Sequence, residues 1–187
     1  MKKLSGGIIA IAIIAIVVAL VVGAYNGMIS KREAVDSKLS DLDVALQRRC
    51  DLIPNLVNTV KGYASHETEI IDKVTEARTK LVNAGSLEEK SAANDELSKS
   101  LSALLVVVEN YPDLKSAENF RQLSDELAGT ENRIAVARKN YNDAVKSYNL
   151  EIKKFPGSVI AGMFNFEEAT YFEASDDASK VPEVSFD

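Results

Sequence analysis

Hydrophobic and polar positions divide the chain into an apolar run near its start, a long region of regularly spaced apolar residues and an acidic end. The apolar run, Ile8 to Val22, contains no polar side chain, and no charged residue occurs between Lys3 and Lys31. A helix from Leu4 to Tyr25 would be about 33 Å long, enough to cross the roughly 30 Å hydrocarbon core of a bilayer. Residues 1–27 are therefore predicted to form a transmembrane anchor, with these side chains towards lipid: Ile8, Ile11, Ile14, Val18 and Val22.

A cleaved signal peptide is the alternative interpretation of the apolar run. A basic start, an apolar core and a small residue, Ala24, before a potential cut all fit it. We favour an uncleaved anchor because the helical pattern resumes soon after the run. Lys31, Arg32 and Lys38 beyond the run nearly balance the two lysines before it, and the short basic start favours a cytoplasmic N-terminus and an exported remainder.

Apolar residues beyond the anchor recur three and four positions apart, which is the spacing of helices that pack as coiled coils. The pattern predicts a first helix over residues 28–82, a second over 87–110 that is opened by a capping box of Ser86 and Glu89, and a third over 116–155. The expected fold is all-α. The N-terminal transmembrane helix continues into an elongated antiparallel bundle of three long coiled-coil-like helices, which together occupy residues 28–155.

The three predicted helices differ in length. The first, of about 55 residues, would be about 80 Å long, whereas the second, of about 24 residues, would be about 36 Å long. Part of the apolar surface of the first helix would then remain uncovered within one chain. We therefore expect the protein to form a homo-oligomer.

Two segments follow the predicted bundle. Residues 156–172 form a short segment that is too short to span a bilayer and too apolar for an exposed tail, so we expect it to dock on the bundle or to enter a membrane surface. Its apolar side chains are Val159, Ile160, Met163, Phe164 and Phe166. Residues 173–187 are acidic and poor in apolar residues, which predicts a disordered tail.

The stretch LQRRCDLIPNLV, which begins at Leu46, places a proline inside the first predicted helix. The apolar spacing keeps its phase on both sides of Pro54, which predicts one kinked helix. The proline removes the hydrogen bond to the carbonyl of Cys50 and costs roughly 3 kcal/mol relative to alanine. The kink either fits the helix to its own core, which is the interpretation we favour, or sets the geometry of an assembly.

Arg49 occupies a seam position of this helix, next to Arg48. We expect its stem to lie along apolar neighbours and its guanidinium to pair with a carboxylate of another helix. A grip on a phosphate or a lipid headgroup is the alternative. The residues predicted for the helix kink and an assembly interface are Arg48, Arg49, Asp51, Pro54 and Asn55.

Charge and composition argue against several functions. The formal net charge is −6 and no basic stripe occurs, which disfavours nucleic-acid binding. His66 is the only histidine, and Ile70 stands where a zinc-protease helix needs a second one. The one cysteine, Cys50, is expected to be an apolar packing residue. We predict no catalytic, cofactor-binding or metal-binding residue, no cofactor and no enzymatic activity.

Three motifs in combination resemble the bacterial LemA family: RRCDLIPNLV from Arg48, YPDLK from Tyr111 and ARKNYNDAV from Ala137. The resemblance extends from Tyr25 to about Phe172. It implies a single-pass protein of the bacterial inner membrane whose soluble part is an antiparallel bundle of long helices. The resemblance implies no catalytic residue and associates the protein with membrane organisation. Members of the family often occur beside membrane proteases.

These observations predict a non-enzymatic, membrane-anchored coiled-coil protein that self-assembles and organises or remodels the bacterial membrane. Its expected partners are further copies of the chain, the lipid bilayer and a membrane protease. The soluble part is expected on the extracytoplasmic side. The alternative is an adaptor that presents substrates or partners to a membrane protease or a signalling protein.

Overall fold

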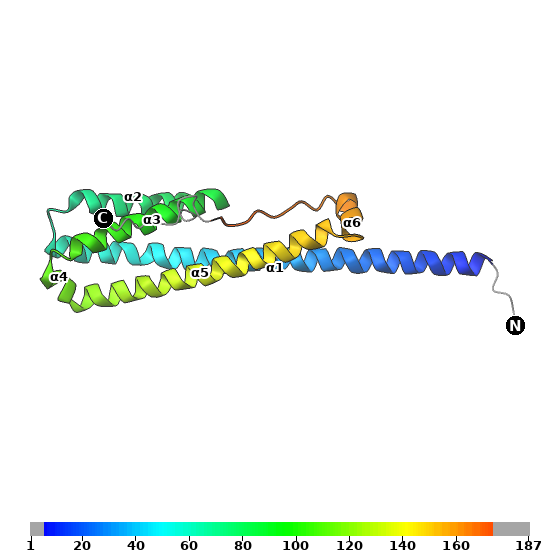
Figure 1. The fold of residues 1–187 in the computed structure, drawn as a ribbon, viewed down its shortest axis with the longest axis horizontal. Coiled ribbons are helices and arrows are strands. Elements are labelled where there is room, and N and C mark those ends of the chain that lie inside the picture. Colours follow the sequence, from blue (N-terminus) through cyan, green and yellow to red (C-terminus); the bar gives the residue numbers. More distant parts are fainter. Residues whose placement is uncertain (1–5, 174–187) are drawn as a thin grey trace, which may run out of the picture. The chain divides into compact units, whose positions relative to one another are not determined.

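The computed structural model describes residues 6–173, and this part of the chain is helical, without a strand (Figure 1). The helices are α1 (Gly6–Tyr63), α2 (Thr68–Asn83), α3 (Leu87–Val108), α4 (Pro112–Ser116), α5 (Glu118–Lys153) and α6 (Gly157–Phe164). The predicted all-α class is therefore confirmed. Of the tail predicted to be disordered, only Glu173 belongs to the described residues.

The chain forms two compact units, each of which takes part of α1 and part of α5. We call the first the anchor unit, which consists of residues 6–39 together with Asn140–Tyr171. The second, the bundle unit, consists of Ser40–Lys139 together with Phe172 and Glu173.

The core of the bundle unit consists of the apolar positions that the spacing of the sequence indicated. Four helices supply it, α1, α2, α3 and α5, rather than the three expected, and α2 and α3 pack directly against each other (Figure 1). Burying such side chains against neighbouring helices, rather than intrinsic helix propensity, is the main source of the stability of these helices. The buried positions that the pattern predicted include Leu42, Leu46, Ile53, Leu56, Val60, Leu97, Leu101, Leu104, Val108, Phe120 and Ile134.

The first soluble helix ends earlier than expected. The prediction of one helix to residue 82 is wrong, because α1 stops at Tyr63 and α2 starts at Thr68. A turn separates them, in which the backbone N–H of Glu67 donates to the carbonyl of Ala64 at 3.2 Å. Ala64 and Ile71 are buried, whereas Tyr63 is exposed, so the buried face continues at the same three-four spacing across the turn. The spacing alone could not reveal the break for that reason.

The start of α3 follows the predicted capping box. The Ser86 hydroxyl accepts a hydrogen bond from the backbone N–H of Glu89 at 3.1 Å, and the Glu89 carboxylate accepts one from the N–H of Ser86 at 3.2 Å. Two of the unpaired N–H groups at the helix start are thereby satisfied. The same carboxylate also accepts from the N–H of Gly85 at 2.7 Å, which fixes the connection from α2.

In the anchor unit, the segment after α6 runs along α5. It leaves α6 at Asn165, whose φ of 55° is left-handed. The Asn149 amide donates to the carbonyl of Ala169 and accepts from its N–H, both at 2.9 Å. The hydroxyl of Tyr148 donates to the carbonyl of Glu167 at 2.9 Å. These bonds satisfy backbone groups of an extended segment that has no strand partner.

Candidate functional site

The helix α1 continues through Pro54, as the unbroken apolar phase predicted. Because proline has no N–H, the carbonyl of Cys50 has no donor within the helix. The Nε–H of Arg78, on α2, donates to this oxygen at 2.8 Å. A charged donor from the next helix thus takes the place of the missing backbone bond. Whether Pro54 bends the helix in a way that guides assembly stays a prediction.

Arg49 is buried and makes three polar contacts inside the bundle unit. Its Nη1 donates to the side-chain oxygen of Asn94 at 2.7 Å and to the hydroxyl of Ser98 at 3.0 Å, both on α3. Its Nη2 lies 2.9 Å from a carboxylate oxygen of Glu131 on α5. Burial lowers the pKa of Arg49, and the Glu131 charge opposes that shift. The expected pairing of the seam arginine with a carboxylate of another helix is confirmed.

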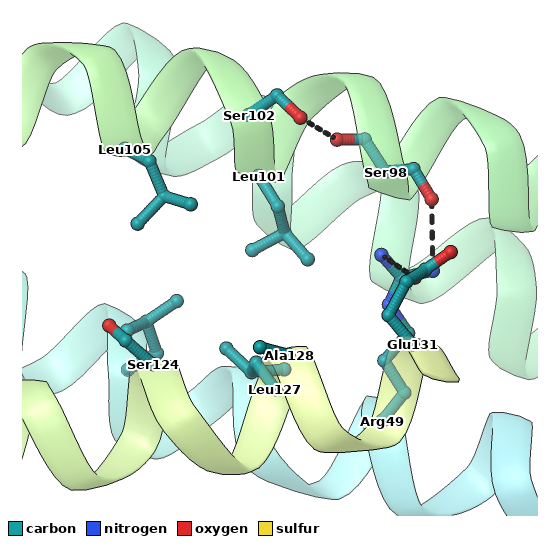
Figure 2. A pocket seen from close by; sticks show the side chains of 10 residues that line it. Arg49, Ser98, Leu101, Ser102, Leu105, Ser124, Leu127, Ala128 and Glu131 are labelled. Carbon is teal, nitrogen blue, oxygen red and sulfur yellow. Dashed lines mark hydrogen bonds and ion pairs between the residues drawn. The ribbon is translucent and has the colours of Figure 1, made fainter. Parts of the chain in front are cut away.

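A cavity of about 320 Å³ lies beside Arg49, between α3 and α5. In Figure 2, Leu101 and Leu105 of α3 face Leu127 and Ser124 of α5 across it, and the Arg49–Glu131 pair closes one end. Four leucines and an alanine supply the apolar part of its walls, and three serines line it as well. Among the described residues, the Nε of Arg49 and the hydroxyl of Ser124 are the buried side-chain polar atoms without a hydrogen-bond partner. Both residues line the cavity, so it is an apolar slot with two polar atoms available.

The residues that line the cavity include no nucleophile paired with a base. Its serines have no histidine nearby, and Glu131 is held by Arg49 rather than aimed at a hydroxyl. Burial raises the pKa of the Cys50 thiol, which keeps it protonated and unreactive. In the part of the chain that the structure describes, no group of three or more His, Cys, Asp or Glu residues could hold a metal ion.

The other residues of the predicted kink and interface lie on the outside of α1. Arg48, Asp51, Pro54 and Asn55 are exposed, so the structure does not bring them together with the buried Arg49. Arg48 forms an ion pair with Glu126 of α5 at 3.2 Å, again within the bundle unit. Sequence reasoning thus grouped an inward and an outward surface of the same helix.

Three residues that contact Arg49, contact the Cys50 carbonyl or line the cavity were not predicted: Asn94, Arg78 and Ser124. Asn94 could have been found, because it occupies the seam position three residues before Leu97, where a buried amide needs a partner. Arg78 and Ser124 carry no such signal. Their roles depend on which helices become neighbours in space.

The five predicted lipid-facing residues of α1 are exposed in the structure. The helix contains a segment that is long and apolar enough to cross a membrane, and none of that segment is buried by the protein. A helix of this kind near an N-terminus is also compatible with a signal sequence.

The predicted C-terminal apolar residues divide between two faces of α6. Ile160 is buried, and the ring of Phe164 lies 4.9 Å from the ring of Tyr25, while Val159 and Met163 point into solvent. Phe166, just beyond α6, is 5.6 Å from Tyr25. The segment therefore docks on α1 by one face and leaves the other face apolar and uncovered.

Comparison with known proteins adds a family. The family model described as the LemA family matches residues 38–186. Magnetosome protein MamQ 2 of Paramagnetospirillum magneticum is 29% identical over 182 residues, which cover 83% of this chain and 67% of the relative. Magnetosome protein MamQ of Magnetospirillum gryphiswaldense is 27% identical over 174 residues, covering 79% of this chain and 64% of the relative. Protein LemA of Metamycoplasma hominis is 28% identical over 160 residues, covering 83% of this chain and 71% of the relative.

Proposed function

This chain belongs to the LemA family, and we propose that it is a non-enzymatic, membrane-anchored helical protein that self-assembles and thereby organises or remodels a bacterial membrane. The apolar part of α1 would hold it in the inner membrane, with the bundle unit on the extracytoplasmic side. The observation that carries the proposal is an uncovered face of the bundle unit, formed by α1 and α5.

The α1 side of this face consists of Val44, Arg48, Asp51 and Asn55. They lie at positions i, i+4, i+7 and i+11, which places them in one row on a helix, and all four are exposed. Val44 is 68% exposed, whereas Leu42 and Leu46, which flank it on α1, are buried. A row of this kind extends along the helix opposite to its buried seam.

The α5 side continues the same face. Glu126, Arg133 and Val136 are spaced seven and three residues apart on α5, and Val136 is 60% exposed. The ion pair between Arg48 and Glu126 joins the two rows, and Arg133 lies 3.5 Å from the same carboxylate. We call these two rows together the α1–α5 face.

A second copy of the chain matches the α1–α5 face in both apolar character and charge. A two-fold interface pairs a surface with itself, so it requires both signs of charge on one patch. The α1–α5 face has arginines and carboxylates beside two exposed valines. Copies related in this way could bury the valines and exchange ion-pair partners.

Multi-angle light scattering of the full chain in detergent tests self-assembly. We expect a mass above that of the monomer for the wild type, and a shift towards the monomer for Val44→Asp and Val136→Asp. Val106→Asp is the matched control, because Val106 is 71% exposed but lies on α3. A monomeric wild type at micromolar concentration would contradict the proposal.

The effect on membranes is tested with vesicles that contain the reconstituted protein. Electron microscopy should reveal curved or tubulated vesicles with the wild type and with Val106→Asp. Vesicles with Val44→Asp should stay round if assembly drives the remodelling. If the vesicles are still remodelled when assembly is lost, membrane remodelling does not depend on self-assembly, and that part of the proposal is wrong.

The second candidate function is an adaptor for a membrane protease or a signalling protein, and the cavity beside Arg49 favours it. An apolar slot with an unpaired N–H and an unpaired hydroxyl suits an apolar side chain of a partner that brings one acceptor. Ala128→Leu would fill the slot without adding a charge. If the purified protein stays monomeric and binds a membrane protease only before this substitution, the adaptor function is the better description.

A further inference from the structure

The short helix α6 of the anchor unit has an uncovered apolar face. We infer that α6 lies in the interfacial layer of the same bilayer that α1 crosses, with its uncovered face against lipid. The inference rests on the membrane anchor of the proposed function and does not depend on self-assembly. It makes the anchor unit a two-point contact, with one helix through the membrane and one on its surface.

The contacts of α6 with α1 place it where the apolar part of α1 ends. Tyr25 lies three residues beyond the apolar run that ends at Val22, and the centroid of its ring is 4.9 Å from that of Phe164 and 5.6 Å from that of Phe166. Tyrosine and tryptophan concentrate at the boundary between hydrocarbon and headgroups. Tyr25 is therefore at the depth expected for such a boundary, and the two phenylalanine rings that contact it lie beside that boundary.

The first charged residue after the apolar run, Lys31, marks the outer side of the headgroup layer along α1. Lys31 forms an ion pair with Glu151 at 2.8 Å, near the end of α5. The rise from Tyr25 to Lys31 is about 9 Å, comparable to a headgroup layer of roughly 5–7 Å. The chain from Glu151 to Phe166 is thus held between a hydrocarbon boundary and a polar layer.

A close backbone approach fixes α6 at this height. Gly157, the first residue of α6, is buried, and a Cβ atom there would be 2.2 Å from the carbonyl oxygen of Glu151 and 3.1 Å from the Cε of Met28. Only glycine permits that approach without a shift of the backbone. The helix is therefore attached to α1 and α5 of the anchor unit by a contact that leaves it little freedom.

The uncovered face has the composition of a lipid contact. Val159 and Met163 are four residues apart on α6 and are 55% and 68% exposed, whereas Gly157, Ile160 and Ala161 are buried. Phe155, in the turn before the helix, is 84% exposed. No charged residue occurs between Phe155 and Phe166. Three large apolar side chains exposed on so short a helix and the turn before it are unfavourable in water but suit the acyl-chain boundary. Lys154 precedes Phe155, where its amino group can reach the headgroups.

Tryptophan fluorescence can locate α6 because the chain contains no tryptophan. The full chain with Met163→Trp is reconstituted in phosphatidylcholine vesicles, and its quenching by lipids brominated at shallow and at deep chain positions is measured. Ile14→Trp reports the membrane span, and Ser147→Trp is the matched control, since Ser147 is an exposed residue on the α5 part of the same unit. All three positions are exposed, so the substitutions leave the core intact.

We expect the Met163→Trp protein to be quenched more by shallow than by deep bromine and to emit at shorter wavelength than the Ser147→Trp protein, which should be quenched by neither lipid. If Met163→Trp behaves like Ser147→Trp while Ile14→Trp is quenched, the inference is wrong and the anchor stands. If Ile14→Trp is not quenched either, both the inference and the proposed anchor are wrong. A short-wavelength emission without quenching that fades on dilution would overturn the inference in favour of a second copy covering α6.

Discussion

Replacing Arg78 tests whether this side chain compensates for the proline inside α1. The Nε of Arg78 donates to the carbonyl oxygen of Cys50 at 2.8 Å. That carbonyl lies four residues before Pro54, which has no N–H to offer it. Arg78→Met removes the donor but keeps an unbranched apolar stem, so the lost hydrogen bond is the main change.

The expected size follows from the burial of the carbonyl. A hydrogen bond from a charged donor contributes about 1.5–3 kcal/mol, and a buried carbonyl without a partner costs about 1–3 kcal/mol. Cys50 is buried, so we expect Arg78→Met to lower the free energy of unfolding by about 1–3 kcal/mol. Pro54→Ala supplies the missing N–H and should hold or raise stability. In the Pro54→Ala background, Arg78→Met should therefore cost about 1–2 kcal/mol less.

Urea unfolding of the full chain in detergent, followed by far-ultraviolet circular dichroism, gives the four free energies that this comparison needs. Arg133→Met is the matched control: its ion pair with Glu126 is exposed and 3.5 Å long, so its loss should change stability by less than about 0.5 kcal/mol. Equal losses from Arg78→Met in the two backgrounds would refute the reasoning, because Arg78 would then stabilise the protein through contacts unrelated to the carbonyl.

Three further predictions use the same unfolding assay. Arg49→Leu should lower the free energy of unfolding by about 1–3 kcal/mol, because the buried side-chain oxygen of Asn94 loses its donor. Adding Asn94→Leu should recover much of that loss. If it does not, the loss does not come from the unpaired Asn94 side chain. Gly157→Ala should destabilise the anchor unit by about 1–3 kcal/mol through the clash of its Cβ with a backbone carbonyl, whereas Gly162→Ala, where a Cβ would meet no atom within 4 Å, should be neutral or better. Burial raises the pKa of Tyr141, so its phenol ionises less readily in the folded than in the unfolded state. The free energy of unfolding should therefore keep its full value below a pH of about 10 and fall as the pH rises through the folded-state pKa. This fall should be absent in Tyr141→Phe.

Helix class and buried faces could be predicted from the sequence because they depend on local spacing. The capping box at Ser86 and the buried positions of α3 follow from residues a few places apart. The end of α1 at Tyr63 could not be predicted in the same way. The turn up to Glu67 keeps the apolar spacing, and no proline marks it. A pattern that continues in phase is compatible both with one helix and with two.

The candidate site was only partly predictable for a different reason. That Arg49 would meet a carboxylate follows from the energetics of burying a charge, whichever carboxylate is available. That the carboxylate is Glu131, and that Asn94 and Ser98 share the guanidinium, depends on the register between helices far apart in sequence. The cavity beside Arg49 depends on that register too, because its walls come from α3 and α5.

The proline and the unexpected turn are parts of the same arrangement. In one straight helix to residue 82, Arg78 would lie 28 residues beyond Cys50, or about 42 Å along the axis. The turn after Tyr63 lets α2 fold back, and the guanidinium of Arg78 then comes within 2.8 Å of the carbonyl that Pro54 leaves unpaired. Without the reversal the proline would leave a buried carbonyl without a donor, and without the proline Arg78 would compete with a backbone N–H for the same oxygen. The carbonyl that Pro54 leaves without a backbone donor is therefore a contact point for the returning helix α2.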